Sequence, residues 1–449
     1  MHRSILSVFL LIACSVSAQL TTHSPFSSYG FGERYTSGDA ISGAMGQSSV
    51  AFFDSTYLNY RNPASYNSLS KGQPLFSLGL EGRVSSYTQG TNNIINGFGM
   101  VDHFVLAIPI RNHFGLAFGL RPFSRRGYEI HDQISVGTDS VHYVYDGNGG
   151  VNETFIGLSS SLVKFRGTHL SIGANLGYLF GSSTNQRKSY LVQFNSFTGG
   201  VEKTSYRFNS FHYELGAYLC QKIDKVHSFK IGVTMEPMQK AKGYLDRQLF
   251  AAGNVTNPNT YSLLYDTTNV EGTLNLSPAY SFGFSYLIRK DALENSNISR
   301  NSEWQIHFNY SSNDWTKFSS TFNDVTEEFN YVKTTKISGG IQYTPEIKFI
   351  ENAVTTNFFE RMRYRAGFYT SSLPYYDNSS PVNEIGTTFG IGLPILAQQA
   401  LSSINLSVTI GKRGNGLEDG LNESFVGMNF GVIISPSFYD RWFRKRKLD

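Results

Sequence analysis

The sequence predicts an all-β protein, a transmembrane antiparallel β-barrel of about fourteen strands with an N-terminal plug in its lumen. Charged residues make up only 16% of the chain, whereas soluble proteins carry about 25%. Apolar residues alternate with small or polar ones in many successive segments. No segment after residue 18 approaches 18 uninterrupted apolar residues, so we expect no transmembrane helix. A closed barrel is the other way to satisfy backbone polar groups in lipid.

Residues 1–18 have the pattern of a secretory signal peptide. A positively charged start precedes the apolar run 5–13, and small residues precede a predicted cut before Gln19. The alternative is a lipoprotein cleavage site, with Cys14 as the lipidated residue. An ordinary cut leaves Cys220 as the single cysteine, which excludes an internal disulfide. No Cys/His cluster has metal-ligand spacing, so we expect no metal and no cofactor.

Residues 19–70 are the predicted plug. Small residues in Gly43-Ala-Met-Gly46 would allow this backbone to pack closely against a wall. Asn62, Pro63 and Ala64 form the predicted plug turn, because Pro63 fixes its own φ and pushes Asn62 out of the helical region.

The order of these motifs, with Asp54 between them, resembles the N-terminal hatch of the FadL-type outer-membrane hydrophobic-compound transporter family. It is most similar to the Bacteroidota-type members, as are Ile108-Pro109, residues 121–124 and the ending 442–449. The resemblance implies a fourteen-strand barrel with a short segment folded inside it. It also implies passage of hydrophobic molecules and a place in the outer membrane of a Gram-negative bacterium.

Residues 71–435 are the predicted barrel. In Glu303–Asn309, for example, Trp304, Ile306 and Phe308 alternate with Gln305 and His307. Successive strand residues face opposite sides, and here the second face is mostly Gly, Ser and Asn, which suits a crowded interior with lipid outside. The predicted strands are 75–88, 102–111, 113–122, 151–164, 168–182, 206–222, 226–236, 274–289, 302–312, 333–346, 361–372, 384–396, 401–411 and 424–434.

The connections predict the topology. Tight turns are expected at Asn112, 166–167, 222–225 and 398–399, and long polar loops at 123–150, 183–205, 237–273 and 313–332. Short turns lie on the periplasmic side of outer-membrane barrels and long loops outside; the links 290–301 and 347–360 are longer than this rule expects. Aromatic residues near strand ends predict interfacial girdles, among them Phe123, Tyr128, Tyr190, Phe208, Tyr280, Trp304, Trp315 and Tyr376.

Residues 436–449 are a predicted basic periplasmic tail. Much of the net charge of +4 lies in the last nine residues, so nucleic-acid binding is not indicated. The tail would contact a partner or lipid headgroups, or it would simply be a solvated end attracted to anionic lipid.

The sequence gives no sign of an enzyme. It contains no Gly-x-Ser-x-Gly elbow. His169 and Ser171 share one strand face, but residues two apart on a strand lie about 7 Å apart, too far for a hydrogen bond.

Charged residues on the polar strand faces are the candidates for function. Such side chains could seat the head group of an amphipathic ligand, for instance a carboxylate at Arg365. The alternative is that they pair across the lumen or with the plug, because an unpaired buried charge is costly. The candidate lumen ligand contacts are Arg83, Arg121, His307, Arg363 and Arg365.

The predicted function is a channel or transporter for hydrophobic or amphipathic, fatty-acid-like small molecules, with outer-membrane lipids around it. The alternative is a barrel that acts as scaffold or shuttle in protein secretion or in a larger membrane assembly, with secretion or assembly proteins as partners. The predicted external loops are long but not extreme, so they leave both functions open.

Overall fold

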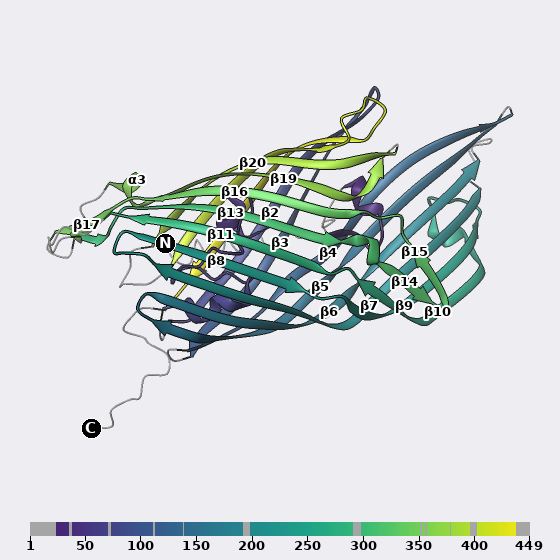
Figure 1. Cartoon of the computed structure of the whole chain (residues 1–449). Coiled ribbons are helices and arrows are strands. Elements are labelled where there is room, and N and C mark those ends of the chain that lie inside the picture. Colours follow the sequence, from purple (N-terminus) through teal and green to yellow (C-terminus); the bar gives the residue numbers. More distant parts are fainter. Residues whose placement is uncertain are drawn as a thin grey trace, which may run out of the picture.

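The protein forms one β-barrel in a computed structural model, with a short N-terminal segment inside it (Figure 1). The structure describes residues 24–35, 38–70, 73–110, 113–137, 139–191, 198–290, 298–350, 353–354, 357–377, 379–395 and 402–436. The predicted signal peptide lies outside these residues, as does the basic tail from residue 437 onward.

Fourteen antiparallel strands close the barrel, as predicted. The last strand pairs with the first from Phe76–Ile434 to Thr88–Asn422, so the wall has no free edge. In order around the wall, the strands are β2 (Leu75–Gln89), β3 (Asn92–Ile110), β4 (Phe114–Val136), β5 (Asp139–Phe165), β6 (Thr168–Leu191), β7 (Gly199–Lys222), β8 (His227–Glu236), β11 (Ala279–Arg289), β13 (Glu303–Asp314), β16 (Lys333–Thr344), β19 (Arg363–Asp377), β20 (Ser380–Pro394), β21 (Ser403–Gly414) and β22 (Asn422–Ile434).

Most of the predicted long loops are strands instead. β4 to β7 continue far beyond the predicted ends. β9 (Gln239–Ala252) pairs with residues 199–208 of β7, and β10 (Tyr261–Leu276) pairs with β9. β14 (Ser319–Phe322) and β15 (Val325–Glu328) extend the same sheet, which rises at one end of the barrel (Figure 1). We call this sheet the extension. Its outer face is largely polar, so the apolar outer face that marks the barrel strands is missing there, whereas its inner face packs around a buried apolar cluster that includes Phe208, Leu274 and Phe322.

The predicted strand 274–289 is two strands, because the chain breaks at Ser277-Pro278 between β10 and β11. Pro278 has no N–H to donate to a ladder. The break lets β10 belong to the extension, while β11 joins the barrel wall between β8 and β13.

The opposite end carries the short connections. Arg166 and Gly167 form a two-residue hairpin turn with φ values of 43° and 86°, as a type I′ turn requires. The two longer links hold β12 (Ile298–Arg300), β17 (Ile347–Ile350), β18 (Ala353–Val354) and α3 (Phe358–Arg361). The predicted turns at Asn112 and 398–399 lie outside the described residues.

The outer face of the barrel is apolar, as the alternation predicted. Phe308 is 45% exposed, whereas its neighbours His307 and Asn309 are 4% and 5% exposed. Tyr280 and Trp304 are exposed on the outer face as expected of girdle residues. In the part of the chain that the structure describes, no helix is long and apolar enough to cross a membrane.

Two other predicted girdle aromatics face inward. Phe123 and Phe208 are buried inside the extension, where Phe31 and Phe318 pack against the same cluster. Both lie where their strands continue into the extension, with their side chains on its inner face. The girdle prediction is therefore wrong for these two residues, and also for Tyr128, which is buried, and for Trp315, which packs against the same cluster.

The main hydrophobic core lies between the wall and residues 38–70, which we call the inner segment. Met45, Phe52 and Tyr66 of this segment pack in one buried cluster with wall residues such as Val105 and Phe155. The N-terminal part of the chain forms η1 (Pro25–Ser28), β1 (Glu33–Arg34), α2 (Ala40–Gly43) and η2 (Pro63–Ser68), and two further 3-10 turns are η3 (Pro258–Thr260) and η4 (Trp315–Lys317).

Exchanging Phe308 for Arg tests the facing of the wall. A cation on a lipid face near the membrane midplane costs about 2–4 kcal/mol, so we expect a reduced fraction of folded, heat-modifiable barrel in the membrane. Exchange of the neighbouring, inward Asn309 for Ala is the control and should assemble much better. Equal assembly of the two variants would contradict the assignment of faces.

Candidate functional site

Glycines of the wall hold the inner segment. At nine of them an added Cβ would lie 2.0 to 2.7 Å from an atom of the inner segment, closer than real contacts allow. Only glycine therefore permits this close approach of the inner segment to the wall. Each stands on a different strand, namely Gly115, Gly157, Gly173, Gly216, Gly232, Gly283, Gly340, Gly367 and Gly390.

Hydrogen bonds add to this contact. The backbone N–H of Gly46 donates to Thr388 Oγ1 at 2.8 Å, on the side of the wall formed by β20. On the β6 side, the Ser171 hydroxyl donates to the carbonyl of Ala64 at 2.8 Å. The inner segment is thus anchored on two sides of the lumen.

The predicted plug turn starts η2. Asn62 is extended (φ −129°, ψ 105°), and its side-chain oxygen accepts from the N–H of Ala64 at 3.1 Å. Its Nδ2 donates to the carbonyls of Val50 and Ala217, at 2.9 and 3.3 Å. One amide therefore ties the turn both to its own segment and to β7, while Pro63 lies against Gly173 and Gly216.

A cavity of about 330 Å³ lies between the inner segment, β1, η1 and the wall. Its lining mixes rings and charges. Six basic side chains line it, Arg34, Arg61, Arg83, Arg125, Lys336 and Arg413, and six acidic ones, Glu33, Glu81, Glu214, Glu236, Glu384 and Glu423. Its aromatic residues are Phe26, Tyr29, Phe31, Tyr35, Tyr87, Phe98, Trp315, Phe318, Tyr331, Tyr369, Tyr375 and Phe425.

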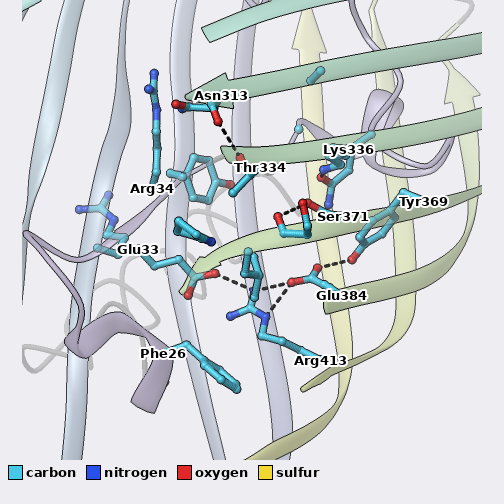
Figure 2. Close-up of a pocket in the computed structure, with 18 of the residues that line it drawn as sticks. Phe26, Glu33, Arg34, Asn313, Thr334, Lys336, Tyr369, Ser371, Glu384 and Arg413 are labelled. Atoms are coloured by element: carbon cyan, nitrogen blue, oxygen red, sulfur yellow. Dashed lines mark hydrogen bonds and ion pairs between the residues drawn. The ribbon is translucent and has the colours of Figure 1, made fainter. Parts of the chain in front are cut away.

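Arg413 of β21 is the best connected of these charges. Its Nη2 lies 2.5 Å from Glu384 and 2.6 Å from Glu33, as Figure 2 shows. Its guanidinium also stands 5.5 Å from the ring centre of Phe26. Because Glu33 and Phe26 precede the inner segment, Arg413 joins the N-terminal part of the chain to the wall.

Arg83 of β2 lies beside this group. Its guanidinium carbon is 3.4 Å from the ring centre of Phe425, and its Nε lies 3.4 Å from Glu423. Nε and Nη2 of Arg83 make no hydrogen bond that satisfies normal geometry. Both of these nitrogen atoms are buried, but the side chain as a whole lines the cavity.

Of the five predicted ligand contacts, only Arg83 lines the cavity. Arg121 is buried, 2.8 Å from Glu153 and 3.0 Å from Glu214, and it donates to the carbonyl of Tyr60. Arg121 therefore pairs with carboxylates of the wall and holds the backbone of the inner segment, which is the alternative to ligand binding that the sequence left open.

Arg365, offered in the sequence as a seat for a carboxylate, is buried against the wall. Its Nε donates to Gln342 at 2.6 Å and its Nη1 to Asn405 at 3.2 Å. Neither partner is acidic, and none of these three residues lines the cavity.

The remaining two predicted contacts face the inner segment. His307 lies edge-on to the ring of Phe52 at 4.9 Å, and Arg363 donates to the hydroxyl of Thr56 at 3.2 Å.

Burial raises the pKa of Asp54, but the charges of Arg363 and Lys230 and a bond from the Thr56 N–H outweigh burial and hold this pKa below its ordinary value.

A buried cluster of polar side chains on β2 and β3 was not predicted from the sequence. Ser77 Oγ lies 2.7 Å from Nε2 of His103, whose Nδ1 contacts Asp102. A bulge at Gly79/Leu80 turns the adjacent Asp102 and His103 both inward, which simple alternation forbids. The hydroxyl of Tyr35 also bonds to Asp102, so this group connects the N-terminal chain to the wall.

Arg413 was missed for a simpler reason. The predicted strand 401–411 ends two residues before Arg413, although one further step of the same alternation places Arg413 on the inner face. That signal was available in the sequence. The convergence of Arg413 with Glu33 was not, because the two residues belong to opposite ends of the chain.

Solved barrels of the same fold exist. A FadL homologue from Pseudomonas aeruginosa superimposes with a TM-score of 0.56 at 11% identity, covering 90% of this chain and 99% of that one. The Ralstonia pickettii toluene transporter TbuX gives 0.51 at 12% identity (89% and 98%). The P. putida toluene transporter TodX gives 0.51 at 16% (90% and 99%). At these identities the likeness establishes the fold.

Sequence comparison gives a family. The model of the family described as BamG matches residues 1–449. None of the curated proteins compared with the chain matches it.

Exchanging Gly232 for Ala tests the contact between wall and inner segment. The new Cβ would lie 2.0 Å from the carbonyl oxygen of Val50, and overpacking of this kind costs about 1–3 kcal/mol. We expect a lower Tm and faster proteolysis within the inner segment. Gly427 is the matched control, since a Cβ there would meet nothing closer than 3.8 Å. A Gly232 variant as stable as the Gly427 variant would contradict the close contact.

Proposed function

The chain belongs to the BamG family, and from its barrel we propose that it resides in the outer membrane of a Gram-negative bacterium and admits amphipathic small molecules into its lumen. The exposed apolar outer face suits a wall surrounded by lipid. TbuX and TodX, which share the fold, are described as toluene transporters; this supports a related task here without fixing the substrate.

The cavity is the observation that carries the proposal. Its volume of about 330 Å³ falls within the range of small-molecule sites. A purely apolar molecule would place carbon against the charged side chains of the lining, whereas an amphipathic one can lay its chain on the aromatic rings and turn a polar group toward the charges. A fatty-acid-like carboxylate would then meet the guanidinium of Arg83, which lines the cavity, beside the stacked ring of Phe425.

The proposal gives residues 19–70 the role of a plug. A fourteen-strand barrel is wider than the eight-strand kind that side chains can fill alone. The inner segment occupies that space, and the contacts at nine wall glycines support a plug that stays in place. We propose that ligands enter from the extension side and that passage requires only local displacement around the cavity. The basic tail, 436–449, would remain on the periplasmic side.

A second candidate, a scaffold for secretion or assembly proteins, is favoured by the extension. Leu263, Leu264 and Tyr265 on β10 and Val325 on β15 are 53% to 69% exposed, although they lie outside the apolar band of the barrel. Exposed apolar side chains of this kind often mark protein contacts. In this role the firmly held inner segment would stiffen the barrel.

We propose no enzymatic activity. Ser77, His103 and Asp102 are arranged in the order of a nucleophile, base and acid, but all three are at most 5% exposed. None lines the cavity, and the ring of Tyr60 packs 4.7 Å from that of His103. This burial supports a structural role for the group.

Exchanging Arg83 for Gln tests the ligand site. A hydrogen bond to a charged group contributes about 1.5–3 kcal/mol, so binding of a fluorescent fatty acid to the purified barrel should weaken by roughly tenfold or more. The control is Arg363→Gln, which removes a cation that contacts Thr56 instead of lining the cavity. Equal affinities in the two variants would place the ligand elsewhere, and no binding by the wild type would favour the scaffold.

Deleting Ser24 to Ser65 tests the plug. The shortened chain keeps the signal and every barrel strand, and we expect raised, unselective conductance in planar bilayers because the lumen loses its main occupant. Thermal stability is measured in parallel, since the deletion also removes core contacts. A variant that inserts normally yet conducts no more than the full chain would show that the extension closes the barrel instead.

A further inference from the structure

The outer surface of the barrel has a groove separate from the lumen. It crosses β19 to β22, β2 and β3, with a volume of about 580 Å³. The side chains that line it are mainly aliphatic and outward-facing, and Val84, Ile95, Ile410 and Val426 are 47% to 69% exposed. A groove of this kind in a wall that faces lipid is positioned to hold an acyl chain.

One end of the groove is marked by a change in side-chain character. Ile410 pairs with Val426, and both are aliphatic. Lys412 is the next outward residue of β21, about 7 Å further along the strand, and it also lines the groove. Its cross-strand neighbours are Ile385 and Ser424. Neither is acidic, so the ammonium group has no anion beside it across the strand pairs.

This end lies toward the extension. β21 begins at the end of the barrel that carries the short turns and finishes at the end where the extension lies. Ser86 of β2 and Ser424 of β22 line the groove near Lys412. Hydroxyl groups and a lysine therefore follow directly after an aliphatic surface. That sequence of side chains matches the boundary between acyl chains and headgroups.

We propose that this groove binds one anionic membrane lipid, with an acyl chain along Val84, Ile410 and Val426 and the headgroup phosphate at Lys412. The apolar part of the groove explains retention of a chain, and the single cation explains selection by headgroup. The site rests on the proposed membrane location but not on lumen binding. It can therefore fail while the Arg83 experiment succeeds, and the reverse.

The size of the headgroup effect follows from the single cation. One lysine near an anionic lipid surface shifts a binding constant about fivefold. The full chain, purified in a mild detergent, would be titrated with phosphatidylglycerol and with phosphatidylcholine of identical acyl chains, and bound lipid counted by native mass spectrometry. We expect about fivefold tighter retention of phosphatidylglycerol.

Two variants separate headgroup from chain. Lys412→Gln should abolish the preference for phosphatidylglycerol, while Lys240→Gln, at an exposed lysine of β9, should keep it. Ile410→Trp should fill the groove and weaken retention of both lipids severalfold. Ile306→Trp, at an exposed position of β13, is its control and should change neither. Heat-modifiable migration confirms that each variant is folded.

Three results would overturn the proposal. An unchanged lipid preference in Lys412→Gln would exclude the headgroup contact. Equal effects of Ile410→Trp and Ile306→Trp would mean that the lipid is bound without a specific groove. Inorganic phosphate that displaces phosphatidylglycerol completely, combined with no effect of Ile410→Trp, would reduce the site to a simple anion contact.

Discussion

The close contact between the inner segment and the glycines of the wall is the constraint on which the rest of the structure depends. Side chains at these positions would push the inner segment away, because a Cβ on Gly232 alone would overlap the carbonyl of Val50. The contact fixes the depth of the segment within the barrel. It therefore also fixes where Glu33 and Tyr35 reach the wall, and with them the inner boundary of the cavity.

The charges in the lumen follow from this placement. Taking an ion out of water is costly unless it is paired and hydrogen-bonded; Arg121 meets two carboxylates and Arg413 meets three. The equal numbers of acidic and basic side chains around the cavity leave it without a strong net field. Arg83 lines the cavity beside an aromatic ring and is paired with one carboxylate, that of Glu423, so it is the cation to which a ligand could add a second partner.

The barrel presents different chemistry in three directions. Its outer face is aliphatic and aromatic, its lumen combines rings with paired charges, and its extension presents a largely polar outer face with a few exposed apolar side chains. A small-molecule function uses the lumen, a scaffold function uses the extension, and the lipid groove belongs to the outer face. These surfaces share strands but mostly different side chains, since successive residues point to opposite sides; Phe425 is an exception that lines both the cavity and the groove.

The sequence by itself determined the strands of the barrel and their facing. Period-two alternation is a local property, so Phe308 could be placed outside and Asn309 inside from neighbouring residues alone. Only the tertiary structure decided the rest. The extension escaped prediction because its strands have no lipid-facing side to mark them, and the bulge that turns both Asp102 and His103 inward breaks the alternation. The meeting of Arg413 with Glu33 depends on barrel closure, which brings the two ends of the chain together and which no local pattern encodes.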